Sequence, residues 1–285
     1  MAKVLCSTGA LIGRPNNRDY HLLTEISKRL KCDGYEFMMY SPWYDDYIQI
    51  ASDLKQMNLH FPVMHCEKHI GQAISQGEKG DLEEAFRRFE MNCEMASIIN
   101  AEKMVIHLWD GTISDAHFHN NLQAFGKLVE IADRYNIDVL VENVVCNQAN
   151  PMLHWCELKE KYPNIRFVYD TKMAAFHEQL DQLYQEEYSW LWRDNHIQHY
   201  HVNDYAGGYM EWGKLKALPI GEGHIDFEQF FDFIKKTGYD NTFTVEATAY
   251  NLDGTVNEDV LNRCFSIIRE NICLGHKGTI QKKNK

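Results

Sequence analysis

The chain alternates short apolar runs with longer amphipathic stretches, and the alternation recurs over its whole length. The runs are rich in Val, Ile, Phe and Tyr, which favour strands, whereas apolar residues recur three and four apart in stretches such as 82–89 and 118–135, which favours helices. Because a strand, a helix and a further strand imply parallel pairing, the pattern predicts an α/β fold. The eight predicted strands are Lys3–Ser7, Gly34–Phe37, Phe61–His65, Lys103–His107, Val139–Glu142, Arg166–Asp170, Gln198–Val202 and Thr242–Glu246.

Eight strand–helix units in 285 residues fit a single (β/α)8 barrel, the TIM barrel, better than an open doubly wound sheet, which usually has fewer strands. We expect one barrel domain over residues 1–276, since no Pro/Ser-rich linker divides the chain, and a basic, flexible C-terminal tail over 277–285. One helix is bracketed by its own sequence: Asp226 is an N-cap residue with Gln229 three positions on, and Gly238 is a C-terminal stop.

The composition narrows the class of protein. Asp and Glu number 41 against 29 Lys and Arg, and this net charge of −12 argues against nucleic acid as a partner, because such binding depends on neutralising phosphates. No apolar stretch approaches the roughly 18 residues of a membrane helix, so we expect no membrane partner. The eight cysteines contain no Cys-x-x-Cys pair, and no secretory signal opens the chain. We therefore expect a cytoplasmic protein.

Polar side chains close most of the predicted strands. In a TIM barrel the carboxyl ends of the strands open into the mouth, where the active site is built. The closing residues are all carboxylates or imidazoles, which are the groups that move protons and bind metals. They are His65, His107, Glu142, Asp170, His201 and Glu246.

Four of these residues predict a metal site. Three carboxylates and one imidazole in one mouth would repel one another unless a cation neutralised them. Such a donor set suits one divalent cation, with Mn²⁺ or Mg²⁺ favoured and Co²⁺, Zn²⁺ or Fe²⁺ possible. A lone acidic residue at a strand end is more often a helix N-cap or a loop anchor, but four at matching ends favour a shared metal. The predicted ligands are Glu142, Asp170, His201 and Glu246.

Other residues near the mouth are candidates for substrate contact. His65 and His107 lie at strand ends, Trp109 offers an apolar wall for a sugar face, and Glu36 closes the second strand. Each also has a purely structural alternative. Asn203 and Asp204 follow His201 and are expected to orient it from behind. His199 is expected to be a packed interior histidine.

At these residues the sequence resembles the xylose isomerase-like TIM barrel superfamily, and within it the sugar phosphate isomerase/epimerase branch. The resemblance covers residues 3–273. It rests on seven fragments in order: Val63-Met64-His65, Val105-Ile106-His107, Val141-Glu142-Asn143, Tyr169-Asp170-Thr171, His201-Val202-Asn203-Asp204, Gly221 to Phe227 and Val245-Glu246. It implies a small sugar or sugar-derived substrate, one divalent metal held by the four residues above, and proton exchange between the two glutamates and the substrate. Members are often dimers or tetramers, so a homo-oligomer is possible.

The chain departs from the epimerase pattern at two positions. Met173 stands where epimerases tend to carry a substrate-binding histidine, and Gly207 stands where they tend to carry an arginine. These departures argue against an ordinary free ketohexose as the substrate. The superfamily also contains the abasic-site endonuclease IV enzymes, in which the Met173 position is a metal-binding histidine. A thioether does not replace that ligand, so we do not expect this nuclease activity.

The leading hypothesis is therefore a metal-dependent isomerase or epimerase that abstracts a proton next to a carbonyl and passes through an enediolate, with Glu142 and Glu246 as catalytic acid and base. Two alternatives stay open. A dehydratase or lyase acting on a cyclic polyol or keto acid begins with the same proton abstraction. A non-catalytic sugar-binding barrel would explain Met173 and Gly207 but leaves the two glutamates unused.

Overall fold

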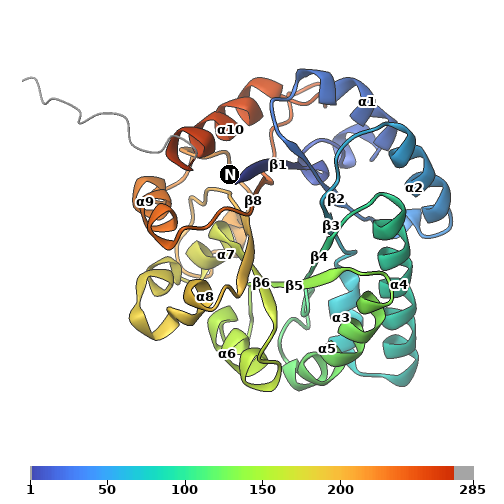
Figure 1. Ribbon diagram of the computed structural model, residues 1–285, viewed down its shortest axis with the longest axis vertical. Coiled ribbons are helices and arrows are strands. Elements are labelled where there is room, and N and C mark those ends of the chain that lie inside the picture. Colours follow the sequence, from blue (N-terminus) through green and yellow to red (C-terminus); the bar gives the residue numbers. More distant parts are fainter. Residues whose placement is uncertain (1, 273–285) are drawn as a thin grey trace, which may run out of the picture.

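The computed structural model describes residues 2–272, and the predicted tail at 277–285 lies outside them. Eight parallel strands close into a barrel in chain order, with the last strand pairing with the first. Figure 1 looks through this ring of strands and shows helices around its outside. The predicted TIM barrel is confirmed. The strands are β1 (Lys3–Ser7), β2 (Gly34–Met38), β3 (Val63–His65), β4 (Lys103–Ile106), β5 (Asp138–Glu142), β6 (Arg166–Asp170), β7 (Ile197–His201) and β8 (Thr242–Val245).

Helices connect the strands. They are α1 (Leu23–Ile26), α2 (Tyr47–Gln56), α3 (His69–Gln76), α4 (Lys79–Ile98), α5 (Phe118–Asp133), α6 (Pro151–Lys161), α7 (Thr171–Phe176), α8 (Trp190–Arg193), α9 (Phe227–Thr237) and α10 (Glu258–Ile272). The expected limits of α9 are confirmed, since Asp226 accepts a hydrogen bond from the backbone of Gln229 and Gly238 adopts a φ of 73°. Within residues 2–272, every helix is too short or too polar to cross a membrane.

At three of the element boundaries that differ from the predicted ones, the structure shows a local reason. β3 begins at Val63 because the preceding Pro62 has no N–H for the sheet. α5 ends at Asp133, two residues early, and Asn136 just beyond it has a left-handed φ of 56°. β8 ends at Val245 because the backbone N–H of Glu246 bonds to the Asn203 side chain instead of a neighbouring strand.

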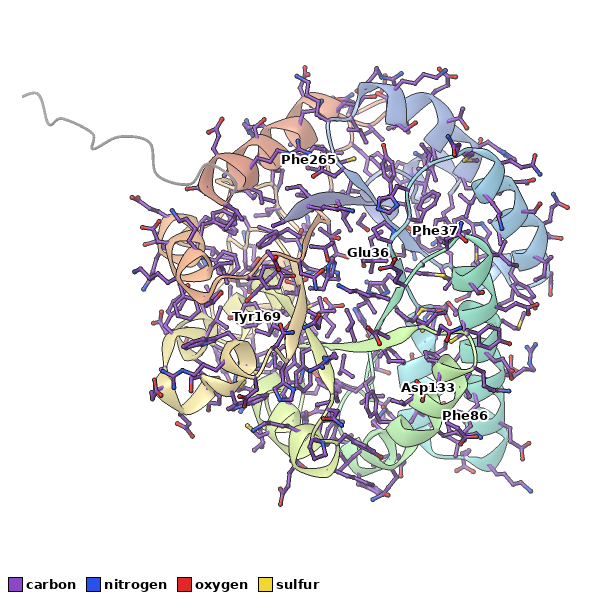
Figure 2. All side chains as sticks on the ribbon, viewed as in Figure 1. Glu36, Phe37, Phe86, Asp133, Tyr169 and Phe265 are labelled. Atoms are coloured by element: carbon purple, nitrogen blue, oxygen red, sulfur yellow. The ribbon has the colours of Figure 1, made fainter. Side chains whose placement is uncertain are left out.

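Alternation along the strands sets which side chains enter the barrel. Successive residues of a strand point to opposite faces, so Glu36 lies inside the barrel while Phe37 packs outward among the helices (Figure 2). The interior below the mouth is closed by a small buried apolar cluster. On all five strands that contribute to this cluster, a polar residue follows the cluster member by two positions, which places both on the inner face. The cluster is Leu5, Val63, Val105, Leu140 and Val168.

Candidate active site

The strand-end residues predicted to hold a metal do meet in the barrel mouth. Each of the four offers one ligand atom, and these atoms lie within 4.8 Å of one another. Three of the side chains are fully buried or nearly so, and Glu246 is 12% exposed on the solvent side. They come from β5, β6, β7 and the residue after β8, and are Glu142, Asp170, His201 and Glu246.

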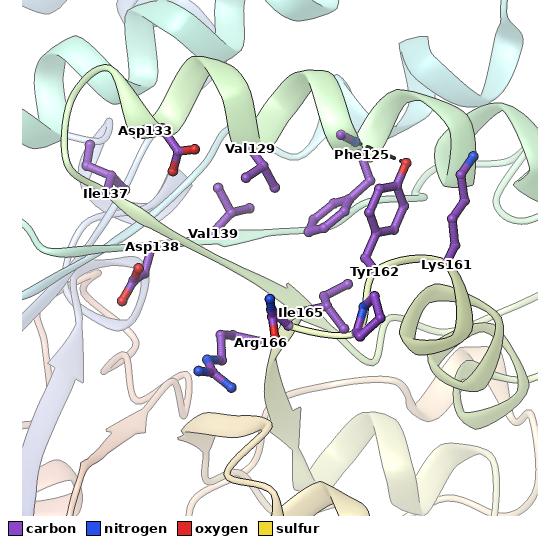
Figure 3. Close-up of a pocket in the computed structure, with 13 residues that line it drawn as sticks. Phe125, Val129, Asp133, Ile137, Asp138, Val139, Lys161, Tyr162, Ile165 and Arg166 are labelled. Carbon is purple, nitrogen blue, oxygen red and sulfur yellow. Dashed lines mark hydrogen bonds between the residues drawn. The ribbon is translucent and has the colours of Figure 1, made fainter.

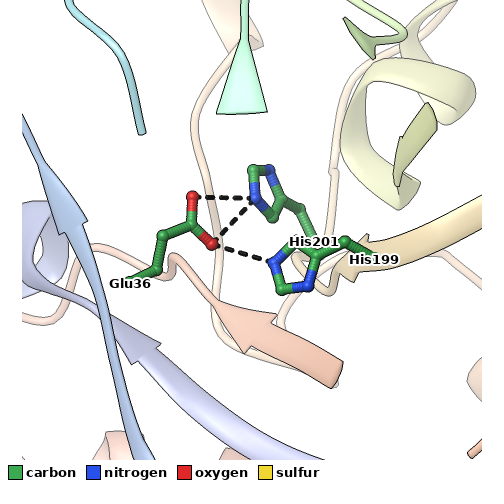
Figure 4. Close-up of side chains that lie close together, drawn as sticks. All are labelled: Glu36, His199 and His201. Carbon is green, nitrogen blue, oxygen red and sulfur yellow. Dashed lines mark hydrogen bonds and ion pairs between the residues drawn. The ribbon is translucent and has the colours of Figure 1, made fainter. Parts of the chain in front are cut away.

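His201 lies at the centre of this group, with different partners on its two ring nitrogens. Its Nε2 is 3.1 Å from both carboxylate oxygens of Glu36, as Figure 4 shows. Its Nδ1 is 3.2 Å from Glu142 Oε1 and 3.6 Å from Glu246 Oε2. Because Glu36 is an acceptor on the Nε2 side, it fixes the ring and leaves Nδ1 facing the carboxylates.

Glu36 also contacts His199, which is fully buried as expected. His199 Nε2 lies 2.9 Å from Glu36 Oε2, and its Nδ1 lies 2.6 Å from the hydroxyl of Thr242. The Thr244 hydroxyl also reaches Nε2, at 3.0 Å. Glu36 is thus held beneath His201 by a neighbouring imidazole. These contacts give Glu36 a positioning role, and its predicted contact with a substrate hydroxyl stays a prediction.

Glu142 connects two groups of imidazoles. While Oε1 faces His201, Oε2 lies 2.9 Å from His107 Nε2 and 3.3 Å from His65 Nε2. His107 is oriented by Asp110, whose Oδ2 is 2.8 Å from Nδ1. Both carboxylate oxygens of Glu142 therefore face nitrogen atoms, and His65, His107 and Glu142 together form another group able to ligate a cation.

Two asparagines tie neighbouring strand ends together. Asn143, after β5, accepts a hydrogen bond from the backbone N–H of Asp170 and donates one to its carbonyl. Asn203, after β7, accepts from the backbone N–H of Glu246 and donates toward Glu246 Oε2 and Asp170 Oδ2, both at 3.3 Å. Asn203 was predicted to orient His201, but its contacts fix Asp170 and Glu246. The recurrent Asn after a strand end was the signal for this role.

Asp204 acts on a loop and not on His201. Its carboxylate accepts hydrogen bonds from four backbone N–H groups that hold the segment returning toward α9. The prediction that Asp204 orients His201 is therefore corrected, because both of its oxygens are engaged by these backbone donors. The donors are Tyr205, Gly221, Gly223 and Ile225.

Trp109 is fully buried just outside the site. Its ring meets Phe118 and His154 edge to face, and its indole N–H donates to the carbonyl of Val144. These contacts show that Trp109 packs within the protein, as its structural alternative predicts. Its contact with substrate stays a prediction.

Charges in the site are strongly coupled. Burial lowers the pKa of His201, but the carboxylates of Glu246, Glu36 and Glu142 outweigh it and hold the pKa well above its usual value. Burial alone would raise the pKa of Glu142, yet His107 and His201 hold it well below the usual range. The metal-free protein therefore favours ionised carboxylates around protonated imidazole.

Asp170 differs from Glu142. Burial raises its pKa, and although Lys172 opposes this, the carboxylates of Glu142 and Glu246 add to the rise. Lys172 had not been identified from the sequence. It is buried, its Nζ lies 3.4 Å from Asp170 Oδ2, and the surrounding carboxylates of Asp170, Glu246 and Glu142 raise its pKa against the effect of burial. The available signal was one charged residue in the otherwise apolar or small stretch 171–176.

The donor set fits a divalent cation. Glu36 occupies the Nε2 side of His201, so the deprotonated ring would direct the Nδ1 lone pair at the carboxylates, as a metal-ligating histidine does. Without a cation, the carboxylates of Glu142, Asp170 and Glu246 share a few buried hydrogen-bond donors. A divalent ion among them would offset their repulsion.

A cavity lies at the other end of the barrel. It has a volume of about 450 Å³ and lies between α5, α6 and the beginnings of β5 and β6, as Figure 3 shows. Asp138 and Arg166, the first residues of these strands, line it. Because catalytic residues of TIM barrels lie at the carboxyl ends of the strands, this cavity is not the candidate site.

Comparisons with known proteins agree with this architecture. One relative is an uncharacterized protein of Methanocaldococcus jannaschii, MJ1311, which is 23% identical over 264 residues, or 85% of this chain and 80% of that protein. D-allulose 3-epimerase from Methylomonas sp., solved with D-allulose, superposes with a TM-score of 0.70 at 13% identity, covering 95% of this chain and 97% of that one. The IolI protein, solved with a zinc atom, gives a TM-score of 0.64 at 14% identity over 94% and 96% of the two chains.

These structural likenesses establish the fold. The family model described as xylose isomerase-like TIM barrel matches residues 25–263, which is most of the chain. The match spans β2 to β8 and includes all four residues of the acid–histidine group in the mouth. The chain therefore belongs to the xylose isomerase-like TIM barrel family.

Proposed function

We propose that this protein is a divalent-metal-dependent isomerase or epimerase of a small sugar or sugar derivative. The observation that carries the proposal is the convergence of Glu142, Asp170, His201 and Glu246 within 4.8 Å in the barrel mouth. The sugar class is supported by the similarity of the fold to an epimerase solved with D-allulose, and a metal by the similarity to a protein solved with zinc.

In this proposal the four residues hold the cation, which supplies Lewis-acid polarisation of the substrate carbonyl. Side chains of the protein carry out the proton transfers. Glu142 and Glu246 come from strands on different sides of the site, β5 and the end of β8, so their carboxylates can take and return a proton on different sides of a bound substrate. Return to the same carbon gives epimerisation, and return to the neighbouring carbon gives isomerisation.

Neighbouring residues set the geometry of these two carboxylates. His107 and His65 hold Glu142 Oε2, and we propose that His107 also contacts substrate oxygens beside the site. Asn203 holds Glu246 through both its backbone N–H and its carboxylate. Glu36 keeps the His201 ring in one orientation. Fixed carboxylates raise the rate because the proton acceptor is already placed when the substrate binds.

The test is the metal content of the purified protein after mild dialysis, measured by elemental analysis for the wild type and for Glu246→Gln. The expected result is about one equivalent per chain in the wild type and a marked loss in the variant, which removes one charged ligand. Lys103→Gln is a matched control, since Lys103 lies at the start of β4, at the opposite end of the barrel. No metal in the wild type, even after addition of Mn²⁺, would contradict the proposal.

The reaction is then sought by incubating the metal-loaded protein with ketoses and aldoses in deuterated water. Deuterium at the carbon next to the carbonyl, with a changed configuration or a shifted carbonyl, is the expected product. A product that absorbs ultraviolet light through a new double bond would identify a dehydratase instead. Metal binding without exchange in any sugar would favour the non-catalytic alternative.

A further inference from the structure

A lysine side chain lies inside the proposed metal site. Lys172 follows Asp170 by two residues and belongs to α7, in which all six residues are buried. It is the only lysine or arginine among the buried residues of the part of the chain that the structure describes. A lysine near the surface usually extends its ammonium into water, but this one has its Nζ 3.4 Å from Asp170 Oδ2.

Lys172 contacts the oxygen of Asp170 that would bind the metal in the proposed site. Asp170 Oδ1 accepts a hydrogen bond from the backbone N–H of Met173 and so caps α7. Oδ2 faces the Asn203 amide at 3.3 Å and the Lys172 ammonium. The same Asn203 amide also reaches Glu246 Oε2, so Oδ2 is the Asp170 oxygen on the side of the other candidate ligands, and Lys172 already contacts it.

We propose that Lys172 is a resident cation of the site that competes with the divalent ion for Asp170. Its ammonium neutralises the Asp170 carboxylate in the metal-free protein and lowers the affinity for the metal, which keeps the metal exchangeable. Lys172 is thus a positioning residue that acts through Asp170. The inference rests on the proposed function, since it assumes that Asp170 is a metal ligand.

Electrostatics gives the direction of the effect. A divalent ion on Asp170 Oδ2 and an ammonium on the same oxygen would be only a few ångströms apart and would repel each other strongly in a buried site. The ammonium must move away from Asp170 when the ion binds, and that movement costs binding free energy. Removing the charge of Lys172 removes this cost, so metal affinity rises although the protein has lost no ligand.

The experiment is direct titration of the apoprotein with Mn²⁺, with free Mn²⁺ followed by electron paramagnetic resonance. Wild type, Lys172→Met and Lys172→Gln are compared with Lys103→Met. The control removes one charge from a half-buried lysine that bonds to Asn241 and the carbonyl of Gln198 at the other end of the barrel. We expect Mn²⁺ affinity to rise by about tenfold or more in both Lys172 variants, because the repulsion acts over a few ångströms, and to stay unchanged in the control.

A second readout separates this role from a structural one. The increase in melting temperature on adding a fixed Mn²⁺ concentration is expected to be larger in Lys172→Gln than in the wild type, because the increase follows affinity. Lys172→Arg, which keeps the charge, is expected to retain the affinity of the wild type. Equal or weaker Mn²⁺ binding in folded Lys172→Met and Lys172→Gln would overturn the inference and leave the proposed function standing. Absence of Mn²⁺ binding in every variant and in the wild type would overturn both.

Discussion

Two buried groups of acidic and imidazole side chains in this barrel contain similar residue types but differ in the number of hydrogen-bond donors for each carboxylate. One is the site group, Glu142, Asp170, His201 and Glu246, and the other is the Asp115 group, Asp115, Cys146 and His154. In the Asp115 group one carboxylate accepts hydrogen bonds from three consecutive backbone N–H groups, at 147–149, and lies 3.0 Å from His154 Nε2.

The site group has fewer donors for each carboxylate. Three carboxylates share one imidazole, one asparagine amide, one ammonium and one backbone N–H, with His107 and His65 adding to Glu142. The pKa of Asp115 lies well below its usual value, since its hydrogen bonds outweigh burial, whereas that of Asp170 is raised. Within the site group, Glu142 faces three imidazoles and has a pKa well below its usual range, so it resembles Asp115 more than Asp170. The comparison teaches that the residue types in a buried group do not set the pKa of its carboxylates, whereas the number and charge of the donors that face each carboxylate do.

The largest effect is expected in the site group, on activity. Glu142→Gln keeps the shape of the side chain but removes the base, so solvent deuterium exchange by the metal-loaded protein is expected to fall by about 10³-fold. The free energy of unfolding of the metal-free protein is expected to fall as well, because the amide cannot pair with the imidazoles of His107 and His201. Exchange at the rate of the wild type would remove Glu142 from the mechanism and weaken the contrast between the two groups.

The next effect is expected in the Asp115 group, on stability. Asp115→Ala leaves three backbone N–H groups and His154 without their acceptor, which is expected to lower the free energy of unfolding by about 3 kcal/mol. Urea denaturation measures this loss. Mn²⁺ affinity of the folded variant should equal that of the wild type, and a large loss of Mn²⁺ binding would show that the two groups are not independent.

A smaller effect is expected beneath the proposed metal site. Glu36→Gln weakens the support of His201 Nε2 without removing a ligand, and Mn²⁺ affinity is expected to fall by about tenfold. His196→Gln is a matched control, because His196 is a buried histidine at the opposite end of the barrel that bonds to the carbonyl of Ile165. Unchanged affinity in Glu36→Gln would show that Glu36 does not act through His201.

The smallest effect concerns pH. Next to the Asp115 group, burial lowers the pKa of His177 to about 4, and its Nε2 accepts a hydrogen bond from the backbone N–H of Cys146. The unfolded histidine, with a pKa near 6.5, binds protons at pH values where the folded one does not, so stability is lost as the pH falls from about 6.5 to about 4. His177→Gln keeps an acceptor and is expected to flatten this part of the curve of unfolding free energy against pH. An unchanged curve would assign the pH dependence elsewhere.

Much of the fold could be predicted because strand alternation is a local property. β1 and β6 match their predicted limits residue for residue, and the other strands differ by at most two residues at an end. The same alternation placed the strand-closing acidic and imidazole residues on one face, so the candidate metal ligands could be named in advance. Their roles in binding and catalysis remain proposals.

Other parts of the site could not be read from the sequence, since they depend on contacts between distant segments. Glu36 and His201 are 165 residues apart, and the closed barrel brings them to 3.1 Å. Lys172 lies on a helix that could have turned its side chain outward, and Asn203 bonds to Asp170 and Glu246 instead of its neighbour His201. The Asp115 group joins two loops and helix α6, and nothing in the sequence near Asp115 indicated its partners.

The sequence by itself determined the (β/α)8 fold and which residues reach the mouth, because periodicity and chain order are sufficient to place strand ends in a ring. Only the tertiary structure decided which atoms meet there: which oxygen of Asp170 caps α7, which nitrogen of His201 faces the carboxylates, and that an ammonium contacts the site. The physical reason is that hydrogen bonds and charge interactions act over a few ångströms, and the chain reaches those distances only after the barrel closes.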